Sequence, residues 1–129
     1  MSAGRSNVDV VREIYTAWLE GRSARDLIAE DVEYVNPPDA VEGGTRRGRA
    51  AFRGIRDAYD DVRIEPLEYI ETPGDDVLVI ARVTGRGQGS GVELDWRQGY
   101  IWTVDDGRAV RFRWFSDPEH ARSAAGLQA

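Results

Sequence analysis

The side chains suited to chemistry in this chain include no thiol and no primary amine. The sequence has no cysteine and no lysine, and its single histidine is His120. Thiolate nucleophiles, cysteine metal ligands, lysine Schiff bases and histidine clusters are therefore excluded. Proton transfer would depend on a carboxylate such as Asp117 or on His120, and an oxyanion would be held by hydroxyl and amide groups. We therefore expect neither a metal nor an organic cofactor.

One alternating run near the C-terminus gathers polar and aromatic groups on one face. Between residues 92 and 104 every second side chain is apolar or aromatic except Gln98, and Gln98 and Tyr100 lie between Trp96 and Trp102. Hydrophobicity directs this face inward, where a buried amide and a buried phenol need partners. Two interpretations stay open. Either protein groups satisfy Gln98 and Tyr100, or these residues line a pocket for a small, largely apolar molecule.

Further aromatic and polar residues are expected to line the same pocket. They are Tyr15, Trp18, Tyr34, Asn36, Tyr59 and Trp114. Several have a purely structural alternative: Tyr15 as a core residue with a satisfied hydroxyl, and Asn36 as a turn residue before Pro37. Asp117 is either a base or only the N-cap of a helix. His120 is expected at the surface.

Hydrophobic periodicity predicts the elements that position these side chains. Apolar residues spaced three and four apart predict a first helix between Ser6 and Gly21, and Ser6 with Asp9 resembles a capping box. A short second helix, a strand at 32–35 and a third helix that includes 51–59 are expected next. After them we expect strands at roughly 62–72, 76–86, 91–104 and 108–116, and a final helix opened by Asp117 and Pro118. This order predicts an α+β fold with an antiparallel sheet.

Composition indicates one domain and limits its partners. The 129 residues fit a single domain over 1–129, and the net charge of -6 argues against nucleic acid. No apolar run approaches the ~20 residues of a membrane span and the opening lacks a signal peptide's apolar core, so we expect a cytoplasmic location and no membrane partner. The arginines between 46 and 56 are interpreted as the solvated face of a helix. The run Val77–Ala81 is apolar on both faces, which favours cover by a second copy and thus a homodimer.

Four segments carry the pattern of a known family. They are Val10–Trp18, Asp31–Tyr34, Gly43–Phe52 and Asp106–Arg108. Together they resemble a SnoaL-like domain of the nuclear transport factor 2-like (cystatin-like) superfamily, which includes ketosteroid isomerase. The resemblance covers about residues 8 to 127 and implies a cone: a strongly curved antiparallel sheet wraps N-terminal helices and leaves a pocket at its open end. It also implies that dimers are common and that activities range from isomerase and polyketide cyclase to none known.

Only some of the functional residues of the family have a counterpart in this sequence. Tyr15 is similar to the first-helix tyrosine that stabilises the enolate oxygen in ketosteroid isomerase. Asn36 stands where that enzyme has its base, an aspartate before a proline, and an amide cannot take up a proton. The enzyme's second oxyanion acid falls near Gly99, and Asp117 resembles a catalytic aspartate of SnoaL-type cyclases. Two functions follow as hypotheses: metal-free acid–base chemistry at carbon with Asp117 and Tyr15, or a non-catalytic ligand-binding or dimerisation module.

Overall fold

The computed structural model describes residues 6–37, 43–53, 59–74 and 76–127. The first helix, α1, spans Asn7–Leu19. Its N-terminus is closed by the predicted capping box: the Ser6 hydroxyl accepts from the backbone N–H of Asp9 at 3.1 Å, and the Asp9 carboxylate accepts from the backbone N–H of Ser6. The capping box satisfies two N–H groups that a helix start leaves without partners.

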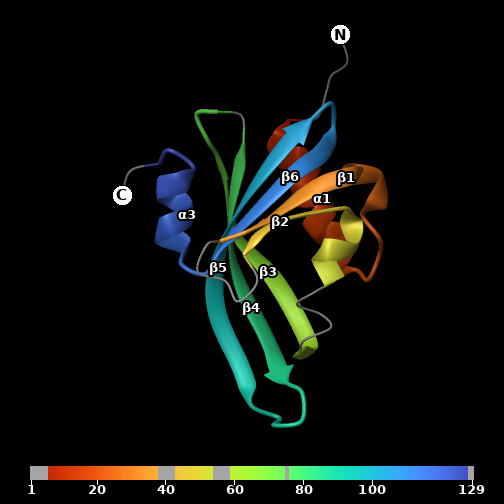
Figure 1. Ribbon diagram of the computed structural model, residues 1–129, viewed down its shortest axis with the longest axis vertical. Helices are drawn as coiled ribbons and strands as arrows, with labels where there is room; N and C mark the ends of the chain where they lie inside the picture. The colour runs from red at the N-terminus through yellow and green to blue at the C-terminus, as the bar shows by residue number, and fades with distance from the viewer. Residues whose placement is uncertain (1–5, 38–42, 54–58, 75, 128–129) are drawn as a thin grey trace.

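The remaining elements are short 3-10 turns, long strands and one further helix. In chain order they are η1 Arg25–Leu27, β1 Ile28–Asn36, β2 Gly44–Arg47, η2 Arg49–Arg53, β3 Tyr59–Glu71, β4 Val77–Gly87, β5 Glu93–Asp105, β6 Arg108–Phe115 and α3 Pro118–Ala124. Among the described residues, these strands form one six-stranded sheet in the order β2-β1-β6-β5-β4-β3. In Figure 1, α1 and α3 lie on opposite sides of this curved sheet.

The sheet is mixed, whereas the sequence predicted an antiparallel one. Strands β3 to β6 are antiparallel neighbours, as the hairpin turns between them predict, but β1 pairs with β6 in parallel. No hairpin joins β1 to β6, because the whole remaining sheet lies between them in the chain. Their relative direction is therefore not set by a local turn. The α+β cone itself is confirmed.

Irregular pairings accompany the curvature of the long strands. The register between β3 and β4 shifts between Asp60 and Arg63 and again between Pro66 and Glu68. The pairing of β5 with β6 shifts between Thr103 and Val104. A bulge bends a strand and increases its twist. The sheet therefore has a concave face, which receives α1, and an outer face.

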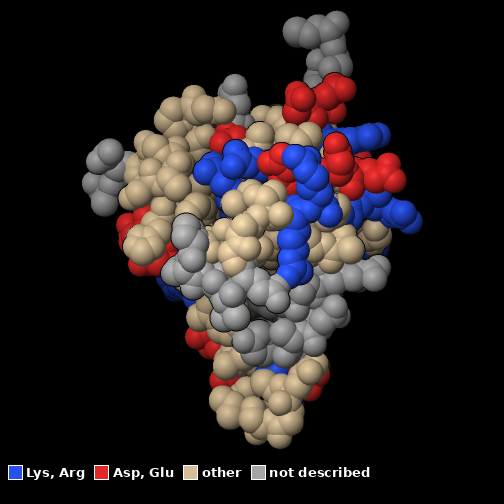
Figure 2. Space-filling view, viewed as in Figure 1, with Lys and Arg blue, Asp and Glu red and all other residues tan. Residues whose placement is uncertain are grey.

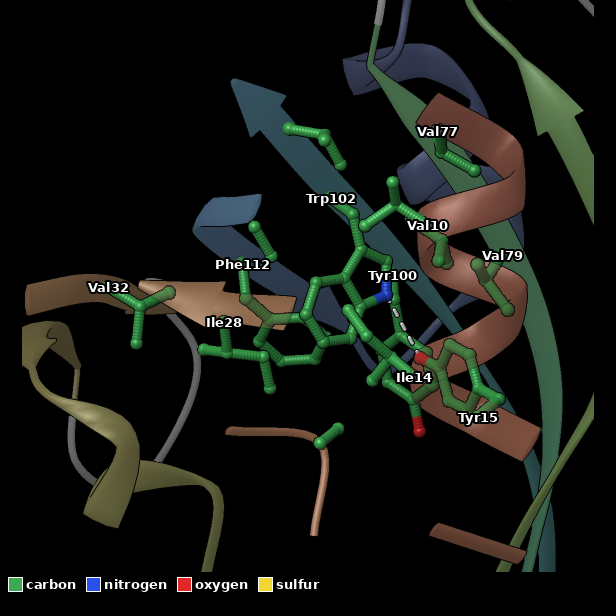
Figure 3. Packing of buried hydrophobic residues seen from close by; sticks show 14 of the residues in the cluster. Val10, Ile14, Tyr15, Ile28, Val32, Val77, Val79, Tyr100, Trp102 and Phe112 are labelled. Atoms are coloured by element: carbon green, nitrogen blue, oxygen red, sulfur yellow. Dashed lines mark hydrogen bonds between the residues drawn. The ribbon is translucent and has the colours of Figure 1, made fainter. Parts of the chain in front are cut away.

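The main core lies between α1 and the concave face. Its fully buried side chains include Val10, Val11, Ile14 and Tyr15 from α1 and Val77, Val79 and Trp102 from the sheet. Figure 3 shows helix and strand side chains pointing toward one another: Val10, Ile14 and Tyr15 on the helix, and Val77, Val79 and Trp102 on the sheet. The helical period of α1 and the alternation of β4 and β5 thus bury the two faces predicted by the sequence.

A second, smaller core explains why both faces of β4 are apolar. Leu78 and Ile80 point to the outer face, where they pack with Ile101 and with Ala121 of α3. Gly99 permits this contact, because a Cβ at that position would lie 2.3 Å from the Cβ of Ala121. The chain's own last helix therefore covers the face for which a second copy was expected. A homodimer stays a prediction, without this argument in its favour.

Some predicted elements have different forms. The short second helix is the 3-10 turn η1, and the third predicted helix is represented by η2. Residues 54–58 of that predicted helix lie outside the described residues, and Tyr59 begins β3 instead of ending a helix. The final helix has the predicted start, with Asp117 as N-cap and Pro118 at its first position. None of the described helices is long and apolar enough to cross a membrane.

The arginines predicted to form one helix face are divided between two elements: Arg46 and Arg47 lie on the edge strand β2, and Arg49 and Arg53 lie in the 3-10 turn η2. Arg46 and Arg47 are exposed and belong to β2, where they pair with Tyr34 and Glu33 of β1. The Glu33 carboxylate accepts from Arg47 at 3.1 Å, and Arg49 donates to the backbone carbonyl of Ile28 at 2.9 Å. Figure 2 shows acidic and basic side chains side by side on the face that it draws. Arg46 and Arg47 are solvated, as predicted, but the alternation of the strand places them on opposite faces, and Arg49 is half-buried.

Candidate functional site

Burial changes along the concave side of β5, and this change locates the candidate site. Trp102 is 0% exposed and Tyr100 is 3% exposed, whereas Gln98 and Trp96, the next residues on the same face, are half-buried. The packed core therefore ends at Tyr100. We call the half-buried part of the concave face beyond it, which begins at Gln98, the open half of the cone.

Aromatic rings fill the packed part of the concave face up to Tyr100, which we call the closed half. Phe52 of η2 stacks on Trp102 with ring centroids 5.6 Å apart and planes 3° apart, and Phe112 lies 4.7 Å from the same indole. Trp18 lies 5.6 Å from Phe52 and 6.0 Å from Trp102. Trp18 and Trp102, both expected to line a pocket, thus lie within the aromatic core. Phe52 was expected only as a helix-lining residue, and no sequence signal indicated that it would stack on Trp102.

Tyr15 lies at the centre of this core with its hydroxyl already in use. The Trp102 indole N–H donates to the Tyr15 hydroxyl at 3.0 Å, as Figure 3 shows. Burial raises the pKa of Tyr15, and the nearby Tyr100 phenol adds to this effect. The phenol therefore keeps its proton at neutral pH. This geometry matches the structural alternative of a core tyrosine with a satisfied hydroxyl.

A second set of hydrogen bonds lies at the border of the open half. The Tyr100 hydroxyl donates to Oε1 of Gln98 at 2.7 Å, and the Trp114 indole donates to Oδ1 of Asn36 at 2.7 Å. The Asn36 amide nitrogen donates to the backbone carbonyl of Gly44 at 3.2 Å. Tyr34 is the next residue on the same face of β1. We call Tyr34, Asn36, Gln98, Tyr100 and Trp114 the amide–phenol cluster.

Both phenols of this cluster are held in the neutral form. Burial raises the pKa of Tyr34 to about 12, although the Arg46 guanidinium partly opposes the shift. Burial also raises the pKa of Tyr100, and the Tyr34 phenol adds to that shift, so the two groups lie close enough to interact. The amides do not titrate. The cluster therefore offers neutral hydrogen-bonding groups beside aromatic walls, an arrangement typical of small-molecule sites.

The two residues expected to move a proton lie on the other side of the sheet. Oδ1 of Asp117 accepts from the backbone N–H of Glu119 at 2.9 Å, which makes Asp117 the N-cap of α3. His120 follows on α3, with its side chain 75% exposed and its Nε2 3.8 Å from Asp117. Because α3 packs on the outer face, Asp117 and Tyr15 are not brought together. Gly99 also points to α3 and not into the cone.

Two remaining predicted residues are only partly defined. Trp96 is half-buried on the concave face of β5, in the open half. Tyr59 begins β3, and its side chain lies outside the described residues. Within the described ranges, no three His, Cys, Asp or Glu side chains gather closely enough to hold a metal ion.

Replacing the Asp117 carboxylate should weaken α3 without changing the cone. We expect Asp117→Ala to lower the free energy of unfolding by about 1 kcal/mol, because the N-cap is lost, and Asp117→Asn to cost less, because asparagine also caps. Chemical denaturation of both variants measures this difference. Ligand affinity should stay unchanged in both. A loss of binding or turnover in Asp117→Asn with unchanged stability would contradict the capping role and support a catalytic one.

The comparisons agree with the class of fold that this geometry defines. A long helix held against the concave side of a curved sheet is the nuclear transport factor 2-like fold, and an NTF2-like protein from Burkholderia thailandensis shares it with a TM-score of 0.75. That protein is 23% identical, and the alignment covers 97% of this chain and 100% of the other. Residues 11–112 match the SnoaL-like domain, so the chain belongs to this family.

Two further structures are similar at comparable levels. TerC, co-crystallized with polyporic acid, is 22% identical with a TM-score of 0.71, covering 95% of this chain and 99% of its own. A protein from Jannaschia sp. CCS1 assigned as a SnoaL-like polyketide cyclase is 18% identical with a TM-score of 0.71, covering 100% of this chain and 97% of its own. Identities this low establish the fold alone. No curated protein matches the chain.

Proposed function

We propose that this SnoaL-like domain binds a small, largely apolar molecule in the open half of its cone. The aromatic side chains of Trp96 and Trp114 would form walls for the apolar part of that molecule. The amide–phenol cluster would hold one polar group of it by hydrogen bonds. The observation that carries the proposal is the end of the packed core on β5, where Tyr100 is 3% exposed and the following Gln98 and Trp96 are half-buried.

This boundary is informative because each side has a different physical character. In the closed half, the rings of Phe52, Trp102 and Phe112 pack against one another and fill the concave face with apolar contacts. In the open half, an amide and an indole stay half-buried on a face that hydrophobicity directs inward. A concave apolar surface with a few oriented polar groups is the usual form of a ligand site. The co-crystal of TerC with polyporic acid supports the idea that a fold of this shape accommodates an organic molecule.

A second candidate function is acid–base chemistry at carbon, of the isomerase or cyclase type. It is favoured by the phenol of Tyr34, whose raised pKa keeps it protonated and able to donate to a developing oxyanion. It is also favoured by the similarity to a protein assigned as a polyketide cyclase. Such chemistry needs a base, and neither Asp117 nor His120 faces the concave side. Binding is therefore the function that the geometry supports best.

Thermal unfolding against a panel of steroids, aromatic polyketides and terpenoids tests the binding proposal. A ligand at 100 times its dissociation constant adds about 2.7 kcal/mol to the free energy of unfolding. For a domain of this size we expect the melting temperature to rise by several degrees, with quenching of tryptophan fluorescence. Trp96→Ala should reduce the rise because it removes a wall of the site.

Val92→Ala is the matched control, since Val92 is 58% exposed and precedes β5. It also removes apolar surface, but outside the open half, and should leave the temperature rise unchanged. Equal effects of the two substitutions would place binding elsewhere on the molecule. The absence of any shift across the panel would contradict the proposal and favour a module without a ligand.

A further inference from the structure

We propose that Gln98 is a specificity-determining residue, oriented by Tyr100 so that its amide nitrogen selects ligands that present a carbonyl oxygen. This inference rests on the proposed binding function and adds the chemical class of the ligand. Its starting point is the hydrogen bond from the Tyr100 hydroxyl to Oε1 of Gln98, 2.7 Å long. This bond uses one of the two lone pairs of the amide oxygen and holds that oxygen toward Tyr100. The Nε2 end, which carries two hydrogens, is therefore directed away from Tyr100.

The donor end of Gln98 has no partner among the described residues. The only side-chain hydrogen bond that the described structure assigns to Gln98 is the one from Tyr100. Gln98 lies at the first half-buried position beyond the packed core, at the border of the open half. When a ligand acceptor reaches such a half-buried donor, the hydrogen bond that forms favours binding.

Asn36 provides an internal comparison, because it carries the same functional group on the same face. Its Oδ1 accepts from Trp114 at 2.7 Å, and its nitrogen donates to the carbonyl of Gly44 at 3.2 Å. Both ends of the Asn36 amide are thus used within the protein. Asn36 holds β1, β2 and β6 together, whereas Gln98 keeps a donor for a ligand.

The other polar groups near Nε2 of Gln98 are compatible with its preference for an acceptor oxygen. Tyr34 interacts electrostatically with Tyr100, and no hydrogen bond is assigned to the Tyr34 hydroxyl in the described part of the chain. Arg46 lies opposite Tyr34 in the β1–β2 pairing, and its positive charge acts on that hydroxyl. A tyrosine hydroxyl can donate as well as accept. Tyr34 can therefore add a second donor beside Nε2 of Gln98, which suits an acceptor oxygen.

A ketone and its alcohol distinguish this preference from simple apolar binding. A ketone oxygen accepts from Nε2 and has no hydrogen that needs a partner. The alcohol of the same skeleton brings an O–H group, and burial of that hydrogen without an acceptor is unfavourable. We expect the native chain to bind α-tetralone about tenfold more tightly than α-tetralol.

The decisive experiment compares these two probes in the native chain, in Gln98→Glu and in Gln88→Glu by fluorescence titration at slightly alkaline pH. The carboxylate that Gln98→Glu introduces would still accept from Tyr100, but it would present an acceptor oxygen in place of the amide hydrogens. We therefore expect the ketone to bind about tenfold or more weakly and the preference to reverse in favour of the alcohol. Gln88 is exposed in the β4–β5 turn, so Gln88→Glu makes the same chemical change outside the cone and should match the native chain.

The outcomes separate failure of this inference from failure of the proposed function. Equal binding of both probes, unchanged by Gln98→Glu, would overturn the role of Gln98 and leave the binding function intact. If neither probe binds at millimolar concentration, the binding function for compounds of this class fails, and the inference fails with it. Gln98→Met removes the amide hydrogens without adding a charge. It tests the role of Gln98 if Gln98→Glu does not fold. It should abolish the preference for the ketone.

Discussion

We expect the chain to unfold cooperatively as the pH rises from about 10 to about 12, the window between the ordinary pKa of tyrosine and the raised pKa of the buried Tyr34. Burial raises the pKa of Tyr15, Tyr34 and Tyr100 above the ordinary value. Within this window the unfolded chain releases phenolic protons that the folded chain still holds. The free energy of unfolding therefore falls as the pH rises. Below pH 10 the contribution of these phenols is fully present, and above the folded pKa it is lost.

The composition makes this transition easy to interpret. The chain has no lysine and no cysteine, whose side chains would otherwise titrate close to this window. Tyrosine ionisation is therefore the signal that reports the transition. The shift of Tyr34 from 10.0 to about 12 alone corresponds to roughly 3 kcal/mol. Burial also raises the pKa of Tyr15 and of Tyr100, so both phenols add to this loss in the same direction.

Circular dichroism across this pH range, together with tyrosinate absorbance, measures the transition. Tyr34→Phe should move the midpoint to higher pH, because one phenol with a raised pKa is removed while its ring stays. Tyr69→Phe is the matched control, since Tyr69 is less buried and has a smaller shift. A native fold that persists above pH 12, or ionisation of all five tyrosines near pH 10 without unfolding, would show that Tyr15, Tyr34 and Tyr100 are not buried as the structure describes.

The sequence was sufficient to predict the elements whose burial pattern is periodic. The α1 stripe, the capping box at Ser6 and the strands β3 to β6 follow from local spacing, and the structure confirms them. The concave face of β5 was also predicted from alternation, including the aromatic Tyr100 and Trp102. Strand β2 was not predicted. Its four residues, Gly44–Arg47, are exposed at the sheet edge, so they carry no hydrophobic alternation.

The candidate site was harder to predict because its geometry depends on long-range contacts. The sequence placed Gln98 and Asn36 on inward faces. It could not show that protein groups bond both ends of the Asn36 amide but only the oxygen end of the Gln98 amide. Asp117 had two interpretations, and only the packing of α3 on the outer face separates them. Gly99 was a usable signal, because a glycine within a strand often marks a close approach of another backbone. Here it marks the contact with α3.

Truncation of Trp102 should be the most damaging single substitution in the core. Trp102 is 0% exposed and touches the rings of Tyr15, Trp18, Phe52 and Phe112. We expect Trp102→Ala to lower the free energy of unfolding by about 3–5 kcal/mol, since the lost contacts leave a cavity. Denaturant unfolding of both chains measures the change, with one m-value (the dependence of the free energy of unfolding on denaturant concentration) fitted to both. A loss below about 1 kcal/mol would contradict the packing around this indole.

The hydrogen bond within this core can be separated from the packing by a double-mutant cycle. Tyr15→Phe leaves the Trp102 indole N–H buried without an acceptor, so we expect a loss of about 1–3 kcal/mol. Trp102→Phe removes the donor, keeps an aromatic ring and should cost less than Trp102→Ala. The double variant loses both partners at once and leaves neither unpaired. Its loss should therefore be smaller than the two single losses together, whereas strict additivity would mean that the bond contributes nothing to stability.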